Sequence, residues 1–219
     1  MSSSRLARAG SAFRLYSPKR AEKIISRCDA WIMWAQDRYG VPGAFIKTML
    51  FQELTAMDGL DILADWAVKL YWLKYGLLSR IRRICKMPPY PGFPSGLLRK
   101  RDSSTGYGQV FARTAIQAIR FSLEKGLDES PQALGLKNVP DENEPDDLRL
   151  IWYRLHREPR FNIRMAALTL LSAAEETTGR MDFSSYTPEE IQLIFTRYNA
   201  NTKAVTDYGR EAYQYYIGL

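Results

Sequence analysis

The spacing of apolar residues constrains this chain most strongly, because it repeats at three and four residues and nowhere alternates. A period near 3.6 is typical of helices that bury one face, whereas alternation would indicate half-buried strands. Turn and capping signals divide the pattern, and Thr187 to Glu190 has the form of a capping box with Pro188 in the first turn. We expect helices at about 18–39, 42–55, 60–75, 109–125, 145–157, 161–178, 187–199 and 202–216. The sequence therefore predicts an all-α protein.

The chain has 219 residues, which favours one domain with a full apolar core. Residues 1–16 are polar with interspersed arginines, and we expect them to form a flexible basic arm. We expect residues 17–219 to form the single domain. Four prolines lie between Met87 and Ser95. They exclude a helix there and predict an ordered loop insertion over 87–107.

Charge and composition exclude several classes of site. The chain carries 31 basic and 24 acidic residues, a net charge of +7, which suits an anionic partner such as a nucleic acid, a membrane surface or a cell-wall polymer. Two cysteines and one histidine exclude a disulfide scaffold and histidine-based metal sites, so we expect no metal and no cofactor. His156 is expected to be a surface or capping residue.

Basic residues gather on both sides of the proline-rich loop. They are Arg80, Arg82, Arg83, Lys86, Arg99, Lys100 and Arg101. They fit an anionic wall polymer or a nucleic acid, and a solvated surface is the simpler alternative. Because no zinc finger, RNA-binding or basic-zipper motif is present, we expect no nucleic-acid partner.

Targeting signals are not evident. The N-terminal residues are polar and basic, and no apolar run of the length of a signal-peptide core follows them, so we expect no Sec signal peptide. No run of 18 apolar residues occurs, so we expect no membrane span.

Glu53 occupies an unusual position for a charged residue. Phe45, Ile46, Met49 and Leu50 form the apolar stripe of the helix at 42–55, and Glu53 takes the next position on that face. Burial among apolar neighbours raises the pKa of a carboxyl group, and the negative end of a helix dipole acts in the same direction. Both effects favour a protonated carboxyl at neutral pH, as a general acid requires. The alternative is that Glu53 faces water at a helix end.

Three segments, in this order, resemble motifs of lytic transglycosylases and goose-type lysozymes. The first runs from Tyr39-Gly40-Val41-Pro42 to Gln52-Glu53, and in that family the corresponding helix ends in the catalytic glutamate. The second is Asp102 to Val110, which contains Gly106-Tyr107-Gly108-Gln109. The third comprises Asn162-Ile163, Tyr198-Asn199-Ala200 and Tyr208-Gly209. The match depends on the joint order of these motifs over residues 18–216, because each one alone is common.

The resemblance implies a lysozyme-like helical domain with a proline-rich loop insertion. It also implies a muramidase that cleaves the β-1,4 bond between N-acetylmuramic acid and N-acetylglucosamine in peptidoglycan glycan strands. By the same resemblance Glu53 is the general acid and base. The implied substrate-binding residues are Gly106, Tyr107, Gly108, Gln109, Tyr198 and Asn199.

The resemblance leaves the product of the reaction open. An inverting hydrolase needs a second carboxylate roughly 6.5–9.5 Å from the first, and Asp102 is the candidate that matches the goose-type motif. Asp58, Asp61 and Asp65 are further candidates, and Asp102 could instead cap a loop beside Ser103. A lytic transglycosylase needs no second carboxylate, because the 6-hydroxyl of the substrate attacks and forms a 1,6-anhydro product.

Two alternatives to a muramidase stay open. One is a catalytically inactive lysozyme-like module that binds the wall or has a structural role, and the other is a helical nucleic-acid-binding protein. A muramidase would act at the bacterial cell wall, in the periplasm or outside the cell. Without a Sec leader, delivery would be by phage, virion or specialised secretion, or a leader has been removed. An injected effector would imply a proteinaceous inhibitor or immunity protein.

Overall fold

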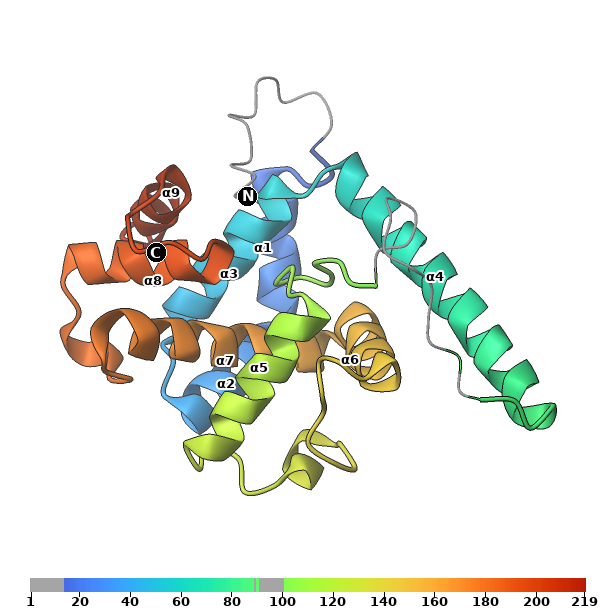
Figure 1. The fold of residues 1–219 in the computed structure, drawn as a ribbon. Helices are drawn as coiled ribbons and strands as arrows, with labels where there is room; N and C mark the ends of the chain where they lie inside the picture. The colour runs from blue at the N-terminus through green and yellow to red at the C-terminus, as the bar shows by residue number, and fades with distance from the viewer. Residues whose placement is uncertain (1–13, 89, 91–100) are drawn as a thin grey trace.

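The computed structural model describes residues 14–88, 90 and 101–219 (Figure 1). In this part of the chain there is no strand, only two isolated bridges, so the predicted all-α class is confirmed. The α-helices are α1 (Pro18–Arg27), α2 (Asp29–Tyr39), α3 (Gly43–Ala56), α4 (Gly59–Ile84), α5 (Ala112–Glu124), α6 (Pro145–Arg157), α7 (Pro159–Thr178), α8 (Pro188–Asn199) and α9 (Asp207–Tyr216). Short 3-10 helices occupy Pro131–Leu134 and Phe183–Ser185.

Two predicted segments lie partly outside the described residues. Of the predicted arm at 1–16, only residues 14–16 are described, and the Leu15 N–H donates to the Met57 carbonyl. Of the predicted proline-rich loop, residue 89 and residues 91–100 lie outside the described part.

Three helices differ most from the prediction, and α5 begins at Ala112 rather than near residue 109. The segment at 18–39 is two helices, because the Cys28 N–H bonds back to Ile25 in a tight turn between them. The helix expected to stop at Gly76 continues to Ile84, since an internal glycine costs a helix only about 1 kcal/mol. A Cβ at residue 76 would lie 2.9 Å from Nη1 of Arg149, the end of a flexible side chain. The last helix begins at Asp207, where Thr206 caps it.

Helix caps explain where several elements begin. The predicted capping box is confirmed, because Thr187 accepts from the Glu190 N–H and the Glu190 side chain accepts from the Thr187 N–H. Asp58 and Asp61 form the same reciprocal arrangement at the start of α4. Their carboxylates are therefore engaged in starting a helix.

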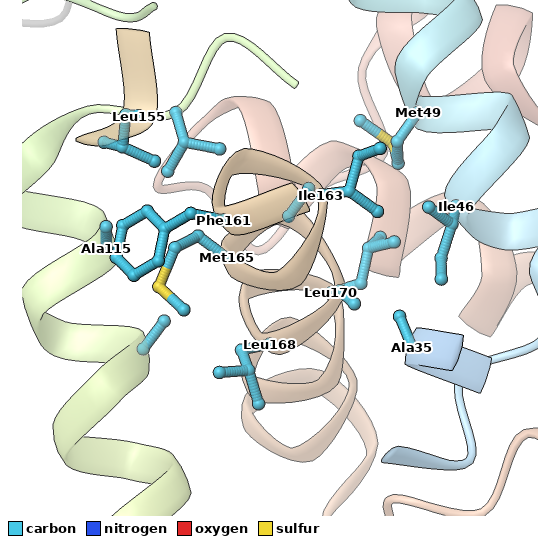
Figure 2. Packing of buried hydrophobic residues seen from close by; sticks show 14 of the residues in the cluster. Ala35, Ile46, Met49, Ala115, Leu155, Phe161, Ile163, Met165, Leu168 and Leu170 are labelled. Atoms are coloured by element: carbon cyan, nitrogen blue, oxygen red, sulfur yellow. The ribbon is translucent and has the colours of Figure 1, made fainter. Parts of the chain in front are cut away.

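Helix α7 forms the centre of the core. Its buried side chains lie all around its circumference, as expected of a helix surrounded by others. Figure 2 shows Phe161, Met165 and Leu168 on the side facing α5, whereas Ile163 and Leu170 face Ile46 and Met49 of α3. Helices α2, α3, α5, α6 and α8 surround α7 (Figure 1). This arrangement places α3, α5 and α8 around α7, and the candidate site lies between these four helices.

Candidate active site

A pocket of about 340 Å³ opens between α3, α5, α7 and α8. Most of its polar lining is uncharged amide or hydroxyl groups. These come from Ser104, Gln109, Thr114, Gln117, Thr169, Ser172, Asn199 and Asn201. Glu53 lines the pocket, and so does Glu176, which forms an ion pair with Arg197. The pocket therefore offers neutral hydrogen-bonding groups beside the Glu53 carboxyl.

Glu53 is buried, with 5% of its surface exposed, at the position that its helical spacing predicts. Ile46, Met49 and Leu50 on the same helix are fully buried, so the stripe carries Glu53 into the interior. Tyr208 Oη donates a hydrogen bond of 2.6 Å to Glu53 Oε1, and it lies 3.9 Å from Met49 Sδ. Tyr208, a neutral donor, thus helps to orient the carboxyl at the wall of the pocket.

Tyr208 reaches Glu53 because α9 packs very closely on α8. A Cβ at residue 209 would lie 2.1 Å from Thr196 Oγ1 and 2.4 Å from the Gln192 carbonyl oxygen. Only glycine permits that approach without displacing backbone. The hydroxyls of Thr196 and Thr206 lie 3.2 Å apart and join the start of α9 to α8. Gly209 therefore allows Tyr208 to reach Glu53.

Tyr198 lies beside Glu53 and holds the neighbouring loop. Its hydroxyl donates a hydrogen bond of 2.7 Å to the Gly108 carbonyl oxygen. Burial raises the pKa of Tyr198 well above its ordinary value, and the charge of Glu53 acts in the same direction. Tyr198 therefore stays a protonated donor at any pH at which a folded protein works.

Residues 105–110 form a tight turn at the edge of the pocket. Thr105 and Val110 pair through both backbone hydrogen bonds, and Gly106 and Gln109 between them adopt left-handed conformations with φ of 73° and 46°. A Cβ at residue 106 would lie 2.6 Å from the Leu155 carbonyl oxygen, so this position requires glycine.

Asn162 fixes this turn from inside the protein. The side chain is fully buried on α7 and accepts from the Gly108 N–H at 2.7 Å. Its amide nitrogen donates to the carbonyl oxygens of Thr105 and Leu155. One side chain thereby bonds to three backbone groups, of which the Thr105 carbonyl also accepts from the Val110 N–H.

Gln109 lines the pocket, and its side chain spans the turn. Its amide nitrogen donates to the Gly106 carbonyl at 2.8 Å, and its amide oxygen accepts from the Ser104 hydroxyl at 3.2 Å. These contacts hold the amide at the pocket wall.

Asp102 caps α5. Its two carboxylate oxygens accept from the N–H groups of Ala112 and Arg113, each at 2.9 Å. Burial raises the pKa of Asp102 to about 6, although these donors act in the opposite direction. The residue lies outside the pocket lining and caps a helix, whereas the alternative drawn from the sequence was a loop cap beside Ser103.

Asp65 connects α4 to the site loop. Its carboxylate accepts from the hydroxyls of Ser103 and Thr105 at 2.7 and 2.8 Å. His156 Nδ1 lies 3.0 Å from Thr105 Oγ1, and its ring stacks on Trp152. His156 was expected at the surface or as a cap, but it belongs to this partly buried network.

The structure brings together part of the predicted site. Glu53, Gln109, Tyr198 and Asn199 line one pocket. Gly106 and Gly108 shape the adjoining turn, and Asp102 lies outside the lining.

Tyr107 also lies outside the pocket lining and faces another part of the molecule. Burial raises the pKa of Tyr107, and the next contributions come from Cys28 and Tyr16, near the start of the chain.

Sequence reasoning missed two residues that organise the site. Tyr208 and Asn162 both fall in quoted motifs, but they were interpreted as marks of the fold and not as contacts of Glu53 and the turn. Their polarity on otherwise apolar helix faces was the available signal.

The described residues contain no group of three or more histidine, cysteine, aspartate or glutamate side chains that could hold a metal ion. Over the same residues, no helix is both long and apolar enough to cross a bilayer. Comparisons with protein-family models, with curated proteins and with solved structures found no match.

Proposed function

We propose that this protein is a muramidase with a lysozyme-like helical domain that cleaves peptidoglycan glycan strands at the N-acetylmuramic acid to N-acetylglucosamine bond. The observation that carries the proposal is Glu53, a buried carboxyl held by Tyr208 at the wall of a pocket lined with amides and hydroxyls. A carboxyl in such a setting is suited to protonate a leaving oxygen.

The pocket lining supports a sugar as the substrate. Amide side chains such as Gln117 and Asn201 can pair with hydroxyl and acetamido groups in both directions, because each has a donor and an acceptor. Phe111 and Tyr198 add aromatic surface to the lining. The Glu176 charge is balanced by Arg197, so the lining does not select strongly for a charged ligand.

The positions of the aspartates favour the transglycosylase form of the reaction. Asp102 caps α5, Asp58 and Asp61 cap α4, and Asp65 accepts from Ser103 and Thr105. None of the four lines the pocket. Because Glu176 of the lining is ion-paired with Arg197, we assign the acid role to Glu53. Glu53 first donates its proton to the glycosidic oxygen as the bond from C1 to that oxygen breaks. The Glu53 carboxylate then accepts the proton of the 6-hydroxyl as O6 bonds to C1, which leaves a 1,6-anhydro end and regenerates the acid.

Mass spectrometry of purified peptidoglycan digested with wild type, Glu53→Gln and Asp102→Asn tests this function. We expect anhydro-muropeptides from wild type and Asp102→Asn, and no products from Glu53→Gln. Reducing muropeptides that disappear in Asp102→Asn would instead indicate a hydrolase with Asp102 as the second carboxylate. If wild type yields no product from several wall types, the enzyme proposal fails. Wall binding by an inactive wild type would then favour the binding-module alternative.

A further inference from the structure

Helix α4 carries an apolar stripe on the side that faces away from the protein. Only Val68, Tyr71, Trp72 and Tyr75 of its 26 residues are buried. The stripe consists of Trp66, Leu70, Leu73, Leu77, Ile81 and Ile84, whose side chains are between 44% and 73% exposed. The spacing of three and four residues places all six on one face of the helix, opposite the buried residues.

The stripe residues are not part of the hydrophobic core. At about 1.5 Å per residue, α4 extends for about 39 Å and projects from the side of the helical body (Figure 1). Large apolar side chains in a continuous row on the surface mark an interaction site. Single exposed leucines are common on protein surfaces, but six large apolar residues on one helix face are not.

The residues that flank the stripe are basic, which favours an anionic partner. The described residues 66–88, which include the stripe, contain six lysines and arginines and no acidic residue. Lys69 and Lys74 fall on opposite flanks of the stripe by their helical positions. The partner must therefore be apolar where it meets the stripe and anionic on both sides of it.

A pocket on one flank of the stripe also combines apolar and basic side chains. It has a volume of about 530 Å³ and lies between α4 and α6. Leu73 and Leu77 of the stripe line it together with two guanidinium groups, Arg80 and Arg149, the second of which is also 3.2 Å from Asp146. Guanidinium groups bind phosphate oxygens well, and here two of them lie next to apolar surface.

We propose that α4 lies along the surface of an anionic lipid membrane, with its outward stripe in the acyl boundary and its basic residues among the headgroups. A helix with one apolar face and flanking lysine and arginine binds a membrane interface in this way without crossing it. A second copy of the chain is the less favourable occupant, because pairing two stripes would place lysine flanks against lysine flanks with no acidic partner. This inference does not depend on the muramidase proposal.

Vesicle co-sedimentation of the full chain tests the proposal. Wild type is compared on neutral phosphatidylcholine vesicles and on vesicles with about one third phosphatidylglycerol. We expect binding to the anionic vesicles that weakens with salt, and little binding to neutral ones. Leu70→Gln with Leu77→Gln should weaken binding at least 10-fold, because two large side chains no longer leave water. The matched control is Met33→Gln with Ile217→Gln, which changes two exposed apolar residues elsewhere and should bind as wild type.

The position of the helix is tested with brominated lipids, which quench tryptophan at the acyl boundary. Trp66 should be quenched, and Trp66→Phe should remove the quenching while the protein still sediments with vesicles. Equal binding to both vesicle types, or undiminished binding of the double stripe variant, would overturn the proposal. So would a wild-type dimer, measured by light scattering, that the stripe variant dissociates. Circular dichroism of each variant establishes that its fold is retained.

Discussion

Tyr208 and Glu53 lie 155 residues apart in the chain and are joined by a hydrogen bond of 2.6 Å. The bond links the last helix to the third, so the carboxyl that we propose as the acid is oriented by the element that completes the fold. The site is therefore assembled only when α9 has docked.

Replacing Tyr208 with phenylalanine removes the donor and keeps the ring. We expect peptidoglycan cleavage to fall roughly 10- to 100-fold, as a lost hydrogen bond to an ionisable group would produce. A hydrogen bond donated to a carboxylate favours its charged form, so without it the basic limb of the pH–rate profile should move to higher pH. Tyr213→Phe, also in α9, is the control and should retain wild-type kinetics. An unchanged profile in Tyr208→Phe would contradict the positioning role.

Replacing Gly209 with alanine adds a methyl group where Thr196 Oγ1 would be 2.1 Å away. We expect a loss of about 1–3 kcal/mol in the free energy of unfolding, as for other overpacked sites, and a lower rate of cleavage because α9 is displaced. Urea denaturation measures the first effect and muropeptide release the second. Gly59→Ala is the control, because a Cβ at residue 59 meets nothing within 4 Å. Equal stability of the two variants would show that the close packing of α9 is not required.

Replacing Asn162 with alanine leaves three buried backbone groups without their side-chain partner. We expect the free energy of unfolding to fall by about 2–4 kcal/mol, because each unpaired buried polar group carries a desolvation cost. Hydrogen exchange of the Gly108 amide should increase, since this N–H loses its acceptor. Asn143→Ala, at an exposed turn, should change neither quantity. A stable variant with a protected Gly108 amide would contradict the role assigned to Asn162.

Asp102 predicts a pH dependence of stability. Its pKa is about 6 in the folded protein and 3.8 as the reference value, so the folded state holds the proton more tightly. Asp102 therefore contributes stability at acid pH that is lost as the pH rises to about 6. The loss is on the order of 3 kcal/mol.

The variant Asp102→Asn should not show this loss, because asparagine cannot ionise, and its single carbonyl oxygen can still accept one of the two hydrogen bonds from the start of α5. Urea denaturation between pH 4 and pH 7 compares the two proteins. Identical pH dependence in both would mean that Asp102 is not the group responsible. If Glu53 is the acid in both steps, Asp102→Asn should also still cleave peptidoglycan.

Much of the local structure could be predicted from the sequence. Helix starts marked by Ser17 and by the Thr187 capping box, and the helix end at Gly40, lie where their residue types predict, because capping depends on neighbours within a few positions. The burial of Glu53 follows from the apolar stripe that precedes it. The error at Gly76 arose because a glycine within a helix and a glycine that ends one cannot be told apart by residue type alone.

The site itself depended on contacts between residues distant in sequence. The sequence could not show which of Asp58, Asp61, Asp65 and Asp102 could serve as a second catalytic carboxylate, because a capping aspartate and a catalytic one have the same local pattern. The fold resolved their positions by placing Asp102 at the start of α5 and Asp65 against Ser103.

The sequence by itself determined the all-α class and most helices and favoured the burial of Glu53, since these follow from periodicity and capping over short distances. Only the tertiary structure decided that Tyr208 contacts Glu53, that Asn162 holds the turn, and that the apolar face of α4 is directed outward. Packing between helices depends on side-chain shape and backbone approach across the whole chain, and no local pattern of residues contains that information.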